Sequence, residues 1–288
     1  MYQEKGATVN ILVPHDCENK CPFCNIKNLY KTEWNYNMND ILLSMAHLNT
    51  ISRNSDFVIT GGEPLAHMAT LEQILNKTYI LNKQGARHKL FIDTTLPVEK
   101  RNVYRLNDFK QVISGINVAR HINGHIKESD DLLLAALRIP VRICSVLYTE
   151  EEALYAHEII DRFEDIKSVK QIQFRDDYRF VDFENLYNPT TNKRLLNLLK
   201  GLGKSLDDCE FKYDDYKWEC KITPKITFQR TMRQTKITYC NIVDVNGNPL
   251  NDITKINNII IMPDGSILDD WGGQPLDLRE YRKGLKNA

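Results

Sequence analysis

The segment Cys17-Glu18-Asn19-Lys20-Cys21-Pro22-Phe23-Cys24 holds three of the seven cysteines of the chain, in the spacing C-x3-C-x2-C. It follows an apolar run, residues 7–13, which predicts a β-strand. Three thiols so close together, with no secretion signal before them, indicate metal ligation rather than disulfide bonds. The sequence therefore predicts a metal-binding loop at the end of the first strand.

The number of cysteines limits which metal this loop can hold. Structural zinc takes four ligands, commonly in paired C-x2-C or Cys/His motifs, and the sequence has no second such pair. His15 could complete a zinc site, but its closeness to Cys17 would give a cramped chelate. A [4Fe–4S] cluster normally takes four thiolates, so three leave one iron open. An open coordination position is typical of a catalytic centre.

Two motifs together carry a resemblance to a known family. The cysteine motif, with the aromatic Phe23 before its last cysteine, resembles the signature of the radical SAM (S-adenosyl-L-methionine) enzyme superfamily. The segment Phe57-Val58-Ile59-Thr60-Gly61-Gly62-Glu63-Pro64 resembles the Gly-Gly-Glu-Pro segment at the end of that family's second strand. The resemblance implies a [4Fe–4S] cluster on three cysteines, with the amino and carboxylate groups of SAM on the open iron; these cysteines are Cys17, Cys21 and Cys24.

The resemblance also implies a reaction. Reductive cleavage of SAM gives a 5′-deoxyadenosyl radical, which abstracts a hydrogen atom from the substrate, and the electron comes from a donor such as flavodoxin or ferredoxin. Phe23 is expected to pack near the adenine. Gly61 and Gly62 allow the backbone to approach the SAM ammonium closely. Glu63 is either a second acceptor for that ammonium or a hydrogen-bond partner of the barrel.

Composition excludes several classes of protein. The chain has 288 residues, of which 42% are hydrophobic and 26% charged, as in an ordinary globular protein. Its 38 basic residues balance 38 acidic ones, which argues against binding a nucleic-acid polymer. No apolar stretch is long enough to span a membrane. An odd number of unevenly spaced cysteines fits a reducing compartment, so we expect a cytoplasmic protein.

Strands and helices alternate through the first two thirds of the chain. Apolar runs predict strands at residues 7–13, 56–60, 89–95, 112–119, 141–148 and 169–175. Helical patterns lie between and after them, at residues 39–48 with Asn39 as cap, 71–81, about 96–107, 130–137, 149–163 with Thr149 as cap, and 193–202. Six such units predict an α/β fold with parallel strands, either an open barrel or a doubly wound sheet. The family resemblance implies a partial (β/α)6 barrel over residues 1–205.

The last third of the sequence has a different pattern. Residues 218–230, 235–245 and 258–268 predict strands, with turn signals at Asn246-Gly247 and Asp264-Gly265. We expect residues 206–288 to be a β-rich C-terminal extension that covers the barrel opening and binds substrate. Its tail, from residue 271, is expected to be loop.

Side chains that point into the barrel follow from the period of two along each strand. This places Thr95, Asn117 and Arg175 inward, as candidates for binding the SAM ribose or carboxylate. Where family members often carry Thr-Asn-Gly, this chain has Thr94-Thr95-Leu96. Arg175 belongs to an inward row with Gln171 and Gln173, and its alternative is an ion pair with Asp176 or Asp177. Arg142 is a weaker candidate of the same kind.

Other reactive side chains have simpler interpretations. His121 and His125 follow the fourth strand and are expected to be exposed loop residues rather than proton-transfer groups. Cys144 is expected to be a small buried apolar residue. Cys209, Cys220 and Cys240 could hold a second cluster, but they lack a C-x2-C pair and are not assigned to a metal.

Three functions from different classes remain open. The first is a radical SAM enzyme that acts on a small polar molecule, such as a nucleotide, a pterin-like compound or an amino acid. The second is a radical SAM enzyme that modifies a peptide or protein, against which the short segment before the first strand argues mildly. The third is a non-catalytic iron–sulfur or zinc protein. Arg175 favours an anionic or zwitterionic substrate in the first two cases.

Overall fold

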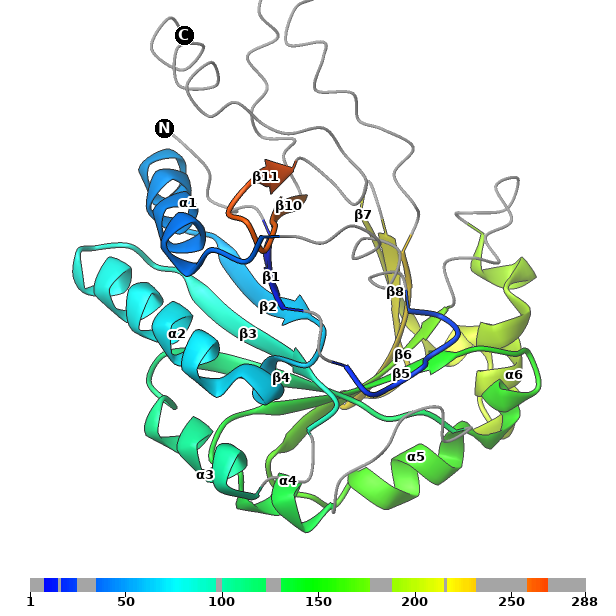
Figure 1. The fold of residues 1–288 in the computed structure, drawn as a ribbon. Coiled ribbons are helices and arrows are strands. Elements are labelled where there is room, and N and C mark those ends of the chain that lie inside the picture. The colour runs from blue at the N-terminus through cyan, green and yellow to red at the C-terminus, as the bar shows by residue number, and fades with distance from the viewer. Residues whose placement is uncertain are drawn as a thin grey trace, which may run out of the picture.

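Six parallel strands form the centre of the fold (Figure 1). The computed structural model describes residues 8–14, 17–24, 35–96, 100–122, 131–176, 188–214, 217–231 and 258–268. In these residues β1 to β6 are neighbours in chain order, each parallel to the next. Their bounds are β1 Thr8–Val13, β2 Asp56–Gly61, β3 Lys89–Thr94, β4 Ile113–Ala119, β5 Val141–Leu147 and β6 Val169–Asp176. The six predicted strands are therefore confirmed to within a residue or two.

Further strands extend this sheet at both edges, so that it has 11 strands among the described residues. Beyond β6 lie β9 (Ile226–Thr231), which is parallel to it, and then the antiparallel β8 (Lys217–Lys221) and β7 (Glu210–Asp214). Beyond β1 lie the parallel β10 (Asn258–Ile261) and the antiparallel β11 (Ile267–Leu268). The mixed α/β fold is thus confirmed, but the sheet is wider than the six strands expected and its closure into a barrel is not seen.

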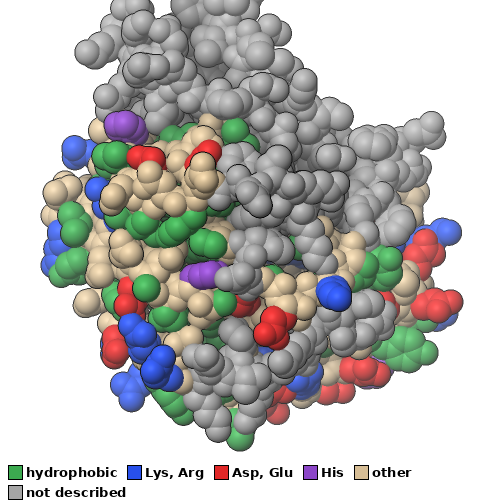
Figure 2. All heavy atoms as spheres, in the orientation of Figure 1, with side chains coloured by type: hydrophobic (Ala, Val, Ile, Leu, Met, Phe, Trp, Pro, Cys, Tyr) green, Lys and Arg blue, Asp and Glu red, His purple; other side chains and the backbone are tan. Residues whose placement is uncertain are grey.

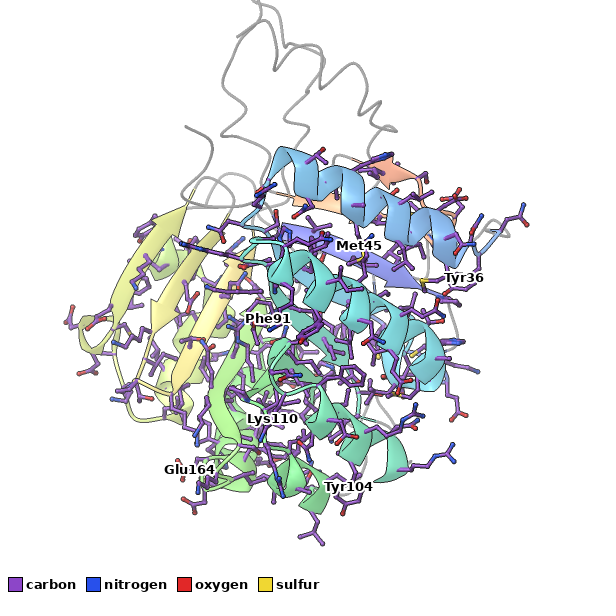
Figure 3. All side chains as sticks on the ribbon, turned by 90° about the vertical axis from the view of Figure 1, so that its left-hand side faces the viewer. Tyr36, Met45, Phe91, Tyr104, Lys110 and Glu164 are labelled. Carbon is purple, nitrogen blue, oxygen red and sulfur yellow. The ribbon has the colours of Figure 1, made fainter. Side chains whose placement is uncertain are left out.

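Helices cover the outer face of the sheet (Figure 1). Alternate side chains of every central strand point towards them and are fully buried, as for Ile92 on β3 and Ile143 on β5. Met45 lies on the inner side of α1, and the exposed Tyr104 of α3 points away (Figure 3). The helices are α1 Met38–Ile51, α2 Met68–Lys83, α3 Lys100–Asp108, α4 Leu132–Ala136, α5 Ala156–Phe163 and α6 Lys193–Gly201, with 3-10 turns η2 Pro64–His67, η3 Glu152–Tyr155, η6 Pro189–Thr191 and η7 Leu206–Asp208.

Two of the predicted helix starts differ from the structure. The cap of α1 is Asn37, whose side chain accepts from the backbone N–H of Asn39 and Asp40, so Asn39 already lies in the first turn. The helix expected from Thr149 is divided into η3 and α5. Thr149 nevertheless acts as expected, because its hydroxyl accepts from the backbone N–H of Glu152 at 3.2 Å.

Two of the predicted C-terminal strands are hairpins. The run 218–230 bends at Thr223, whose hydroxyl accepts from the N–H groups of Lys225 and Ile226, and Pro224 interrupts the pairing. The run 258–268 turns at Gly265, which has φ of 82°. A β-carbon at Gly265 would lie 2.4 Å from Cβ of Asp40 on α1, so only glycine fits there. Residues 235–245, Asn246-Gly247 and the tail from residue 271 lie outside the described residues.

Candidate functional site

The cysteine loop lies against the carboxyl ends of β3, β4 and β5. Asn19 donates to the hydroxyl of Thr95, after β3, at 3.5 Å. The ring of Phe23 packs edge-on against His121, after β4, with 4.5 Å between centroids, and lies 6.2 Å from the ring of Tyr148, after β5. Ligands of parallel α/β folds bind at this end of the strands. The loop is the blue segment beside β5 and β6 in Figure 1.

The three thiols are half-buried and are not in disulfide bonds. A turn closes the loop, since the N–H of Cys24 donates to the carbonyl of Cys21 at 3.2 Å. Burial raises the pKa of the Cys17 thiol; the N–H of Asn19 opposes this, and the charge of Glu63 adds to it. Within the described residues, no three His, Cys, Asp or Glu side chains lie close enough together to bind a single metal ion. The thiolate ligands of a [4Fe–4S] cluster lie farther apart than the ligands of a single metal ion, because each thiolate binds a different iron.

Gly61 and Glu63 shape the end of β2. Gly61 has φ of 121°, a conformation that residues with a β-carbon rarely adopt. The side chain of Glu63 is 5% exposed and accepts four hydrogen bonds, three of them from Thr94 and Thr95. The fourth donor is the N–H of Leu65, at 3.0 Å, so Glu63 also caps η2. Of the two roles considered for Glu63, these contacts are those of a hydrogen-bond partner of the barrel.

The corner after β3 departs from the family pattern at Leu96. This residue has φ of 54° although it is not glycine, and its side chain is fully buried. Its N–H donates to the hydroxyl of Thr94 at 2.8 Å. Leu96 therefore adopts the left-handed conformation at the position where family members often carry glycine.

A polar row crosses the inner face of the sheet. Asp93, Asn117, Arg142 and Gln171 occupy matching positions on β3, β4, β5 and β6. Asn117 donates to Asp93 at 2.6 Å, and Nε of Arg142 donates to Gln171 at 2.7 Å. Gln171 in turn donates to Thr227 on β9 at 2.9 Å. Asn117 therefore faces inward as predicted, with Asp93 as its partner.

Arg175 lies above this row on β6 and also faces inward. Its Nε donates to Gln173 at 2.8 Å. The predicted alternative, an ion pair with Asp176, is wrong, because Asp176 points to the opposite face and pairs with Arg194 at 3.2 Å and Arg230 at 3.6 Å. Asp177, the other partner considered, lies outside the described residues.

Burial raises the pKa of Asp93, while the positive charge of Arg175, the hydrogen bond from Asn117 and the charge of Arg142 lower it. The same two arginines lower the pKa of Cys144, which burial raises. Cys144 therefore shares the inner face with these charges, and it is half-buried rather than an ordinary core residue.

His121 and Arg120 lie at the strand ends beside the candidate site; the sequence analysis set His121 aside as an exposed loop residue and did not consider Arg120. His121 is 6% exposed and accepts from the N–H of Val146 at 3.1 Å, so the expectation of an exposed loop residue is wrong. Arg120 is fully buried and donates to the carbonyl of Thr95 at 2.9 Å. Their position directly after β4 was the available signal. His125 lies outside the described residues.

Of the three C-terminal cysteines, Cys209 and Cys220 lie in the described residues and Cys240 does not. Cys220 on β8 is buried and lies near Cys209, which precedes β7, and burial raises the pKa of both thiols. The second cluster considered for these three therefore remains unassigned.

Comparison with known proteins gives structural relatives only. No family model matches the chain, and no curated protein matches its sequence. Among solved structures, anSMEcpe with bound AdoMet (SAM) and the Kp18Cys peptide is 20% identical, with a TM-score of 0.51 over 70% of this chain and 59% of that one. SuiB from Streptococcus suis, bound to the precursor peptide SuiA, is 14% identical, with a TM-score of 0.58 over 92% and 60%. Both relatives are radical SAM enzymes.

The chain shares the fold of these two structures. It spans about three fifths of the length of each of these relatives. The cysteine motif and the Gly-Gly-Glu-Pro segment that carry the resemblance in sequence follow β1 and β2 of this fold, respectively. The anSMEcpe structures hold bound AdoMet.

Proposed function

We propose that this protein is a radical SAM enzyme that modifies a peptide. The observation that carries the proposal is the position of the cysteine loop, which contacts the ends of three parallel strands through Asn19 and Phe23. The glycine segment after β2 adjoins the same ends, because Glu63 is bonded to Thr95. Two motifs that are typical of one cofactor thus lie at one end of a sheet.

The residues present fit the group that the motifs imply. In the proposal, the thiolates of Cys17, Cys21 and Cys24 bind three irons of a [4Fe–4S] cluster, and the fourth iron binds SAM. The carbonyls beside Gly61 and Gly62 accept from the SAM ammonium, Phe23 packs near the adenine, and Asn117 or Thr95 contacts the ribose or the carboxylate. Glu63 holds the glycine segment in place through its four hydrogen bonds.

The bound cluster and SAM would supply a 5′-deoxyadenosyl radical, which removes a hydrogen atom from the substrate. The contribution of this chain is to orient that cofactor and to keep water from it. Phe23 and His121 form an apolar contact at the strand ends that shields the loop. Asn19 and Thr95 connect the loop to the sheet.

The peptide alternative is favoured over a small polar substrate by the structural relatives. The relatives anSMEcpe and SuiB were both solved with peptides, and one of these is a precursor peptide. We also propose that residues 206–288 contribute to binding the substrate, since their described strands flank both edges of the sheet. Basic and acidic side chains are interspersed on the face drawn in Figure 2, as on a surface without a strong preference for polyanions.

The decisive test is anaerobic reconstitution with iron and sulfide, followed by reduction in the presence of SAM. We expect four irons per chain and release of 5′-deoxyadenosine. Cys17→Ala, Cys21→Ala and Cys24→Ala should abolish both, whereas the matched variant Cys209→Ala should keep both. A stoichiometric zinc ion, or iron and product that survive in the three variants, would refute the proposal.

A second assay addresses the substrate. Peptides, nucleotides and amino acids carrying deuterium are screened for transfer of the label into 5′-deoxyadenosine. Transfer from a peptide is expected. Transfer from a nucleotide or a free amino acid alone would restore the small-molecule alternative.

A further inference from the structure

Two arginines on the inner face of the sheet contact no acidic side chain in the part of the chain that the structure describes. Arg142 and Arg175 each donate one hydrogen bond, through Nε, to the amide oxygen of a glutamine. Across the described residues, no carboxylate lies within 4 Å of either guanidinium. A guanidinium keeps its charge at every physiological pH. Their terminal NH2 groups are thus available to a further acceptor.

Among the described residues, the charges that act on Asp93 come from these two arginines. Asp93 is the acid whose pKa both arginines lower by their charge, and one of its oxygens already accepts from Asn117. Within the described part of the chain, two cations therefore face one acid.

The inner face is also accessible. Along β5, the side chains of Val141, Ile143 and Leu147 point to the helices and are buried, whereas those of Arg142 and Cys144 point inward and are half-buried. Arg175 on β6 is half-buried as well, although its neighbour Gln173 is buried. Two half-buried arginines whose charges both act on Asp93 are a suitable site for an anion from solution.

From this arrangement we propose that Arg142 and Arg175 bind a carboxylate of the peptide substrate, a specificity that rests on the proposed function. The two forks of donors match the planar, bidentate geometry of a carboxylate. Binding this group within the sheet would hold the adjoining part of the peptide near the cysteine loop.

The position of the guanidinium groups favours the substrate over the carboxylate of SAM. Arg175 donates to the side chain of Gln173, two residues earlier on β6, and its charge acts on Asp93. Arg142 is the second residue of β5 and shares a row with Asp93. The cysteine loop, by contrast, contacts Thr95 and His121, beyond the last residues of β3 and β4. The sequence assigned Arg175 to the cofactor; its charge acts on Asp93, two residues before Thr95, so the carboxylate of SAM is the alternative occupant that the test must exclude.

The test uses NMR of the arginine Nε–H groups in the full chain, reconstituted anaerobically with oxidised cluster and labelled with 15N-arginine. The signals are assigned with Arg142→Gln and Arg175→Gln. The probes are N-acetylglutamate N-methylamide, its glutamine isostere, and N-acetylalanine, which carries a terminal carboxylate. We expect one or both carboxylate probes to shift the two signals and the glutamine isostere to leave them unchanged.

The two carboxylate probes distinguish an acidic side chain from a peptide C-terminus, and either response supports the proposal. Each arginine variant should weaken binding by about tenfold or more, as expected for loss of a charge-assisted hydrogen bond. Arg138→Gln, at an exposed position, should not. Absence of any shift with both carboxylates overturns the proposal, and so does a shift of the two signals by SAM alone. Because iron content and SAM cleavage are measured separately, these outcomes are distinct from failure of the proposed function.

Discussion

Glu63 accepts two hydrogen bonds from Thr95 through one carboxylate oxygen, at 2.8 Å from the backbone N–H and 2.7 Å from the hydroxyl. The pair joins the end of β2 to the end of β3. Thr95 also accepts from Asn19, so the same residue connects both motifs of the site. The geometry of the glycine segment and that of the cysteine loop thus depend on one buried carboxylate.

Glu63→Gln is expected to destabilise the fold. The amide presents an NH2 group to donors that need an acceptor, and a buried unsatisfied group costs about 1–3 kcal/mol. Urea unfolding with far-ultraviolet circular dichroism measures the free energy of unfolding. Glu158→Gln, on the exposed face of α5, is the control and should change it by less than about 0.5 kcal/mol. Equal effects of the two variants would contradict the role assigned to Glu63.

Gly61→Ala is expected to disturb the site more than Gly203→Ala. Both glycines have positive φ, at 121° and 63°, but the second value is one that other residues adopt at a modest cost. A β-carbon at Gly203 would also meet nothing within 4 Å. Calorimetric titration of SAM into reconstituted protein should show weakened affinity for Gly61→Ala alone. Unchanged affinity would argue against backbone contact with SAM at this segment.

Asp176→Asn is expected to cost about 3–5 kcal/mol, as for a buried ion pair that loses one partner. The side chain of Asp176 is 4% exposed, and it compensates Arg194 and Arg230, which are 12% and 5% exposed. The contrasting pair, Lys221 and Glu210, is exposed, so Glu210→Gln should cost less than about 1 kcal/mol. Thermal or chemical unfolding of both variants tests the difference. A loss of under 1 kcal/mol for Asp176→Asn would show that the arginines find other partners.

His88 is expected to make stability fall in mild acid. Burial lowers its pKa to about 4. Its Nδ1 accepts from the N–H of Ser55, and its Nε2 lies 2.9 Å from the side-chain oxygen of Asn49. The unfolded chain, with an ordinary histidine pKa of about 6.5, therefore takes up the proton first as the pH falls.

The contribution of His88 is complete above about pH 6.5, declines between about pH 6.5 and 4, and is lost below that, with a total of about 3 kcal/mol at most. Urea unfolding across this range measures it. His88→Gln should flatten the dependence, whereas His47→Gln, at an exposed position, should not. A slope that is unchanged in His88→Gln would assign the pH dependence to other groups.

Local sequence patterns predicted what depends on near neighbours. Apolar runs identified β1 to β6, and alternation placed Asn117 and Arg175 on the inner face, because these features follow from the geometry of a single strand. The bend at Thr223 was missed, although Pro224 signals it, since strand-forming residues such as Ile222 and Ile226 lie on both sides of it.

Contacts between distant segments could not be predicted in this way. His121 has the polar surroundings of a loop residue, but Phe23, nearly 100 positions earlier, covers its ring. Asp176 was considered as a partner of its neighbour Arg175, yet adjacent residues of a strand point to opposite faces, and its partners come from α6 and β9. The cofactor was suggested only by the resemblance of two motifs to a known family, because the hydrophobic periodicity of the sequence carries no information about a cofactor.

The parallel pairing of β10 with β1 has a consequence for biosynthesis. Thr8 and Asn258 are partners in this register, so a nascent chain exposes one flank of its first strand until the ribosome has added some 250 further residues. Pairing between segments so far apart in sequence slows folding. Until it forms, the unpaired edge of β1 can associate with other chains. Insertion of the proposed cluster and binding of chaperones would then compete for the same partly folded intermediate. The time at which iron is delivered during translation would therefore affect the outcome of folding.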